Sequence, residues 1–119
     1  MRLITILKQT ATYELGKAVV NGKFEPINEE VTFLEWLEEL AHQTPEFGKG
    51  VKGGKRMRKI ARKIDEAETA ETITLEDADW SDMKKKLDAM EYAPAKAEAV
   101  LDFMEEFEKA TEHSGTAGA

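Results

Sequence analysis

The sequence predicts a mainly α domain of four to five short amphipathic helices with a small N-terminal β-hairpin around Asn21-Gly22. Three observations support this fold class. Apolar residues recur at three- and four-residue steps over most of the chain, as they do on one face of a helix. A charged fraction of 34% beside an apolar fraction of 41% suits helices with solvated outer faces better than a buried sheet. Asn-Gly between two apolar runs is a strong hairpin signal, because both turn positions need positive φ.

Residues 2–15 fit two structures. Their apolar residues can share one face of a helix that ends at Gly16, a natural C-terminal capping residue. Their β-branched residues favour a strand instead. We favour the helix and keep the strand as the alternative. The hairpin strands follow near residues 17–20 and 23–27, and Pro26 marks the second as an edge strand, since proline has no N–H to donate.

The next helix has clear start and stop signals. Thr32 and Glu35 have the spacing of a capping box, in which each side chain serves the other residue's backbone N–H. We expect this helix to run to about His42, with Trp36 on its apolar stripe. Thr44-Pro45 should end it, because proline disfavours helical backbone in the residue before it.

Residues 47–64 hold eight of the chain's seventeen basic residues and no acid, whereas the rest of the chain carries nine basic and twenty-four acidic residues. Four glycines in the first half of this basic segment predict a loop. The second half has helical apolar spacing and predicts an amphipathic helix from about residue 54 to 67. The basic residues that form the candidate binding face are Lys49, Lys52, Lys55, Arg56, Arg58, Lys59, Arg62 and Lys63.

The C-terminal half predicts two more helices. Residues 69–72 are expected to be a short linker, and Thr74 to cap a helix whose apolar stripe includes Trp80 and Leu87. Pro94 opens the last helix, in the first turn where its missing N–H costs nothing. We therefore expect a single helical domain over residues 1–110. Residues 111–119 have nothing to bury and are expected to be disordered.

The sequence does not indicate catalysis or a cofactor. Gly54-Lys55 is followed by Arg56 rather than Ser or Thr, so the glycines do not match a phosphate-binding loop. The acids around Asp77 and Asp79 resemble the start of a calcium loop but lack its glycine and final glutamate. No cysteine is present, and the two histidines have no metal-ligand spacing. We expect a non-enzyme with no cofactor and no metal. No apolar run is long enough to span a membrane.

The basic segment has three interpretations. Its cations can bind an acidic protein partner, with complementary charge speeding the encounter. They can neutralise nucleic-acid phosphates, although no aromatic residues interleave them for base stacking. They can also be internal, facing the acidic sides of the helices at residues 32–41 and 94–109 or those of a second copy. Surface ion pairs of this last kind each contribute little to the stability of the fold.

Trp36 and Trp80 lie on apolar stripes and are expected in the core, with the alternative that they are interface anchors, where tryptophan is enriched. The sequence thus predicts a cytoplasmic, non-catalytic protein–protein interaction domain of the adaptor, assembly or inhibitory kind, with self-association as one form of partner. The alternative is a small nucleic-acid-binding regulator that uses the same candidate binding face. A short, cysteine-free chain with dense charge and short capped helices resembles many phage accessory and assembly proteins, a likeness that rests on no motif.

Overall fold

The computed structural model describes residues 1–112 of the chain, and these form a mixed α/β fold. Helices account for 54% of the residues and strands for 25%, so the prediction of a mainly α domain is wrong. The strands form two small antiparallel sheets, one of three strands and one of two. In chain order the elements are β1 (Arg2–Thr5), β2 (Ala11–Val20), β3 (Lys23–Val31), α1 (Phe33–Gln43), the 3-10 helix η1 (Pro45–Gly48), α2 (Gly50–Glu66), β4 (Thr72–Leu75), α3 (Asp77–Ala89), α4 (Pro94–Ala99), α5 (Leu101–Glu108) and β5 (Thr111–Glu112).

The first strand corrects the helix favoured for residues 2–15. β1 is the middle strand of a sheet with the order β4-β1-β5 and pairs antiparallel with both neighbours. Ile4 of β1 opposes Ile73 of β4, and both side chains are buried. The β-branched residues of this stretch favour a strand, and they form one because a segment distant in the sequence supplies the pairing partner. That partner, β4, occupies the place of the expected linker and Thr74 cap, and α3 begins only at Asp77 with Glu76 as its N-cap.

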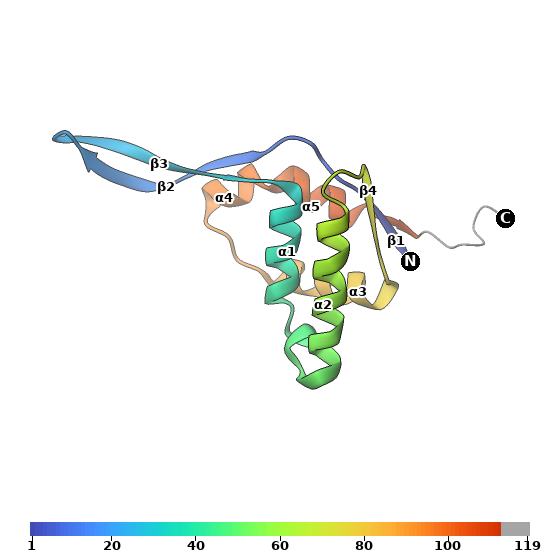
Figure 1. The fold of residues 1–119 in the computed structure, drawn as a ribbon. Coiled ribbons are helices and arrows are strands. Elements are labelled where there is room, and N and C mark those ends of the chain that lie inside the picture. Colours follow the sequence, from blue (N-terminus) through green and yellow to red (C-terminus); the bar gives the residue numbers. More distant parts are fainter. Residues whose placement is uncertain (113–119) are drawn as a thin grey trace.

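β2 and β3 form a hairpin whose turn lies at Asn21-Gly22, where the two φ angles are 52° and 77°. The strands are longer than expected because pairing continues back to Ala11. A register shift between Glu14 and Gly16 places a bulge in β2. Figure 1 shows the hairpin extending away from the helices, with its turn at the far end.

The base of the hairpin packs on the body of the protein. Tyr13 is buried and donates a hydrogen bond to Oε2 of Glu29 across the hairpin at 2.9 Å. Lys96 of α4 places its Nζ 5.4 Å from the centre of the Tyr13 ring and 5.5 Å from that of Tyr92. The same ammonium group donates to Oε1 of Glu39 in α1 at 3.3 Å. This cluster ties the hairpin base to α1 and α4.

α1 and α2 run in opposite directions and are joined by η1 (Figure 1). The predicted capping box of α1 is confirmed: the Glu35 N–H donates to Oγ1 of Thr32 at 3.2 Å, and the Thr32 N–H donates to Oε1 of Glu35 at 3.1 Å. The helix ends at Gln43, one residue beyond the expected end and directly before Thr44-Pro45.

The glycine-rich half of the basic segment is helical, so the predicted loop is wrong. α2 begins at Gly50 and includes Gly53 and Gly54. A Cβ added at Gly53 would lie 2.6 Å from the backbone oxygen of Glu46 in η1. The missing side chain therefore lets η1 pack directly on the first turns of α2.

The last predicted helix is divided into two. Pro94 opens α4 as expected, and Val100 separates α4 from α5 with φ −99° and ψ 7°. Beyond this break, the rings of Phe103 and Phe107 lie 6.1 Å and 6.2 Å from the Trp36 ring, measured between ring centres. α5 therefore packs against α1 through aromatic side chains.

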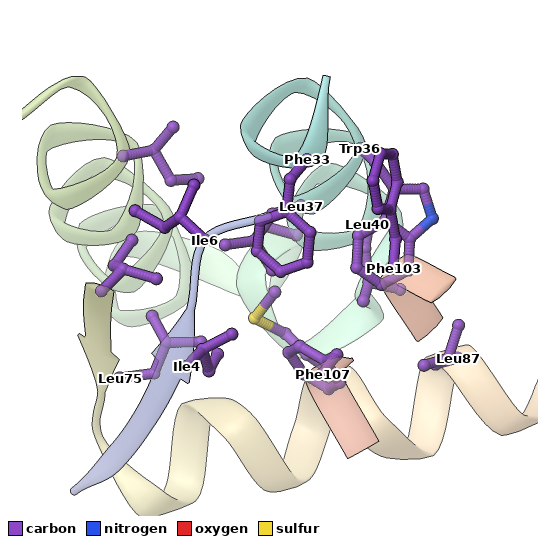
Figure 2. Packing of buried hydrophobic residues seen from close by; sticks show 14 of the residues in the cluster. Ile4, Ile6, Phe33, Trp36, Leu37, Leu40, Leu75, Leu87, Phe103 and Phe107 are labelled. Carbon is purple, nitrogen blue, oxygen red and sulfur yellow. The ribbon is translucent and has the colours of Figure 1, made fainter. Parts of the chain in front are cut away.

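The core lies where helices α1, α2, α3 and α5 meet strands β1 and β4 (Figure 2). The ring of Phe103 meets that of Phe33 edge-on, at 5.4 Å between centres and an angle of 90°. The labelled core residues that are fully buried are Ile4, Phe33, Trp36, Leu37, Leu40, Leu75, Phe103 and Phe107.

The C-terminal tail was expected to be disordered from residue 111. Thr111 and Glu112 form β5 beside β1, and residues 113–119 lie outside the described part of the chain. No helix within residues 1–112 is both long and apolar enough to cross a membrane.

Candidate functional site

The eight basic residues of the basic segment divide into two groups. Three of them, Arg56, Lys59 and Lys63, contact α3, its N-cap Glu76 or β4 through their side-chain nitrogens. The other five are exposed, and we call them the basic face: Lys49, Lys52, Lys55, Arg58 and Arg62.

Arg56 fastens α2 to the first turns of α3. Its Nε and Nη2 lie 2.8 Å and 2.7 Å from Oδ1 of Asp79, and its Nη2 lies 2.7 Å from Oδ2 of Asp82. The guanidinium carbon also sits 4.8 Å from the centre of the Phe47 ring. Partial burial lowers the pKa of Arg56, but the two carboxylates outweigh it and raise that pKa. Because Asp79 is only 6% exposed, this pair belongs to the fold rather than to a binding surface.

Lys59 and Lys63 continue the same contact along α2. The Lys59 ammonium pairs with Glu76 at the start of α3, and their hydrogen bond raises the pKa of Lys59 and lowers that of Glu76. Lys63 donates from Nζ to the backbone oxygen of Thr74 in β4 at 3.2 Å. Three residues of the basic segment are therefore engaged within the fold, although not with the acids that the internal interpretation named.

The acids that hold these residues are not the expected ones. They lie in and just before α3, whereas the acids at residues 32–41 and 94–109 were expected to face the basic segment. In the described part of the chain, Glu39 pairs with Lys96, Glu106 with Lys109, and Glu108 with Lys84. Among these described residues, no acid of either helical segment forms an ion pair with a cation of α2.

The basic face follows one side of α2. Lys52, Lys55, Arg58 and Arg62 are separated by three, three and four residues, so they project from the same side of the helix. Within residues 1–112, the ion pairs and side-chain hydrogen bonds of α2 involve only its other three cations. Val51, at the N-terminal end of this side, is 76% exposed and adds an apolar contact.

The two tryptophans differ in exposure. Trp36 has no exposed surface and donates from Nε1 to the Tyr92 hydroxyl at 3.1 Å, so it is a core residue and not an available interface anchor. Trp80 is half-buried: it stacks on Phe107 at 5.7 Å between ring centres and donates from Nε1 to that residue's backbone oxygen. The Arg2 guanidinium covers its other side at 4.3 Å from the ring centre. Both indole rings thus pack against other residues of the protein, and both indole N–H groups donate hydrogen bonds within it.

A groove of about 450 Å³ lies between the segment after β1, the start of α1 and the end of α2, and we call it the acidic groove. Its apolar lining consists of Ile6, Leu7, Phe33, Leu34 and Ile64. Its charged lining consists of Lys8, Glu35, Glu38, Asp65 and Glu68. In the described residues no three His, Asp or Glu side chains are close enough together to hold a metal ion.

The projecting part of the hairpin exposes large apolar side chains, which sequence reasoning did not identify as a surface. Their exposed fractions are 61% for Leu15, 64% for Val19, 42% for Val20, 77% for Phe24 and 44% for Ile27. Several large apolar side chains exposed on one short segment are typical of an interaction site.

The register places these apolar side chains on both faces of the hairpin. Val19 pairs with Phe24, so these two lie on one face. Val20 and Ile27 lie on the other, because neighbouring residues in a strand point to opposite sides. Consecutive apolar residues beside an Asn-Gly turn, in place of strict alternation, were the available sequence signal.

These observations define a small mixed α/β protein with two exposed surfaces, a basic helix face and an apolar hairpin. Comparison with protein-family models, curated proteins and solved structures finds no match to the chain. The function is therefore inferred from the two surfaces themselves.

Proposed function

We propose that this protein is a non-catalytic binding protein, of the adaptor, assembly or inhibitory kind, whose basic face binds an acidic surface on a protein partner. The observation that carries the proposal is the set of five exposed cations on and beside one side of α2, in a chain of net charge −7. Segregated charge of this kind steers a complementary partner and speeds its encounter. A cytoplasmic location accords with the absence of cysteine.

A protein partner fits the basic face better than a nucleic acid does. Asp65 and Glu66 continue the exposed surface of α2 beyond Arg62, so the cationic surface ends there and does not extend along a phosphate backbone. The exposed apolar residue at the other end, Val51, suits a polypeptide contact. Three cations counted in the nucleic-acid interpretation, among them Arg56, are engaged within the fold, which leaves fewer phosphate contacts.

The basic face is also held rigidly. Two anchors fix α2, the packing of η1 against Gly53 and the Arg56 contacts with α3. The cations therefore project from a preformed helix, and binding does not have to order the backbone that carries them.

Two defined probes test the proposal, poly-L-glutamate as a model acidic polypeptide and random-sequence duplex DNA. We expect poly-L-glutamate to bind in low salt, and Lys55→Glu with Arg58→Glu to weaken that binding about tenfold or more. The matched control is Lys85→Glu with Lys86→Glu in α3, which changes the net charge equally away from the basic face. This control should bind poly-L-glutamate nearly as the unaltered protein does.

The same titrations distinguish protein binding from the alternative function, nucleic-acid binding. DNA binding that is tighter than poly-L-glutamate binding, with a slope of log affinity against log salt near about −4.5 for five phosphate contacts, would instead identify a nucleic-acid-binding regulator. Binding of neither probe, or equal losses in the two double variants, would refute a role for the basic face.

A further inference from the structure

The tip of the hairpin, residues 17–24, combines apolar and basic side chains. Its large apolar residues Val19, Val20 and Phe24 are all exposed, and they lie on both faces of the hairpin. Its charged residues are Lys17 and Lys23, and it contains no acid although the chain as a whole is acidic. A two-stranded hairpin that buries neither face is marginal in water, so the tip gains from being covered.

The acidic groove has the complementary character. Its apolar lining, which includes Leu34 and Ile64, lies among four acidic side chains and one lysine. Two of the acids, Asp65 and Glu68, are exposed, and within residues 1–112 neither forms an ion pair through its side chain. The groove volume of about 450 Å³ is of the size that accommodates inserted side chains in binding clefts.

A hairpin tip cannot reach the groove of its own molecule. The groove lining includes Lys8, three residues before β2, and Thr32, directly after β3. Strand β2 has ten residues, so the tip lies roughly 30 Å from the hairpin base at a rise of about 3.3 Å per residue. Figure 1 shows the tip pointing away from α1 and α2.

We propose that the hairpin tip of one copy inserts into the acidic groove of a second copy of this chain. Every copy carries both surfaces, and the apolar groups and the charges of the two match each other. Phe24 and Val19 would meet the apolar lining, while Lys17 and Lys23 would face the acids at the rim. The contact joins two different patches, so two copies can exchange tips in a closed dimer or continue into a ring or filament.

This self-association goes beyond the proposed function, because the basic face takes no part in it. A charge-swap experiment tests it, with molar mass measured by sedimentation over about 1 µM to 1 mM, the concentrations at which weak to moderate complexes form. We expect the unaltered protein to exceed its monomer mass as concentration rises. Lys17→Glu with Lys23→Glu, and separately Asp65→Lys with Glu68→Lys, should each weaken association about tenfold or more through like-charge contact.

Mixing the two double variants is the decisive step. The reversed tip of one then meets the reversed groove of the other, and the remaining tip and groove match as in the unaltered protein, so association should return. The Lys55→Glu, Arg58→Glu protein should associate like the unaltered one, which separates this proposal from the basic face. A monomer at every concentration, association unchanged by tip reversal, or no recovery in the mixture of folded variants would overturn the proposal.

Discussion

Gly53 and Gly54 are neighbours in α2 with opposite surroundings. A Cβ on Gly53 would lie 2.6 Å from the Glu46 backbone oxygen, whereas a Cβ on Gly54 would meet nothing within 4 Å. Neither glycine has positive φ, so both backbones accept alanine. The difference between the two positions is therefore steric and local.

We predict that Gly53→Ala destabilises the protein and that Gly54→Ala stabilises it. At residue 53, crowding against backbone costs about 1–3 kcal/mol and outweighs the better helix propensity of alanine. At residue 54 the propensity gain of about 0.5–1 kcal/mol stands alone. Urea unfolding of both variants measures the free energies of unfolding. A Gly53→Ala protein as stable as Gly54→Ala would show that η1 does not pack closely on α2.

The contacts of a single residue were predictable where its partner lies only a few positions away in the sequence. Thr32 and Glu35 cap α1 as their spacing indicates, and Pro94 opens a helix. The split of the basic segment was not predictable in the same way. Arg56 is engaged and Arg58 is not because α3 lies on one side of α2, and nothing near either residue in the sequence specifies that placement.

The stability of the outer part of the hairpin depends on its turn. Beyond the cluster at Tyr13, residues 14–17 and 19–30 are exposed, so the strands there are held by their mutual hydrogen bonds. The turn requires positive φ at Gly22, which is 77°. Its sequence and its geometry agree, and for that reason the turn could be located from the sequence.

Gly22→Ala should loosen the outer hairpin without unfolding the body. A left-handed conformation costs a residue with a Cβ about 1–2 kcal/mol, which is large for an isolated two-stranded hairpin. Hydrogen exchange should accelerate in the outer parts of β2 and β3, while unfolding followed by tryptophan fluorescence is unchanged because Trp36 and Trp80 lie in the body.

Gly16→Ala is the matched control for that experiment. Gly16 lies in the same hairpin, has space for a Cβ and does not have positive φ. Its exchange pattern should remain close to that of the unaltered protein. Equal acceleration in both variants, or a large loss of global stability in Gly22→Ala, would contradict an outer hairpin that folds independently of the body.

At the scale of elements, the sequence located helices better than strands. The apolar stripes of α1 and α3 are visible in local periodicity. β1 and β4 are short, and each becomes a strand because the other pairs with it across most of the chain. The glycines of α2 led to the wrong prediction of a loop. Gly53 is required there by its close contact with η1 and not by a turn.

Across the whole molecule, charge and apolar surface are distributed in a consistent way. The cations of α2 that face α3 hold the fold together, and those that face solvent form the basic face. The apolar residues that the body does not bury gather largely on the hairpin. The separation of basic from acidic residues was visible in the sequence. The exposure of the hairpin was not, because it depends on which residues the helices cover in the tertiary structure.

The cluster that joins the hairpin base to α1 and α4 contains both tyrosines of the chain, so an alkaline titration tests the assembled fold. Burial raises the pKa of Tyr92; for Tyr13, burial and the hydrogen bond to Glu29 raise the pKa. Absorbance at 295 nm should therefore show both ionising above the usual value of about 10, and Glu29→Gln should bring Tyr13 back toward it. The unfolded chain releases these protons first, so the free energy of unfolding should fall as pH rises beyond about 10. A tyrosine that ionises at or below about 10 in protein still folded by circular dichroism would show that the hairpin base is not packed as described.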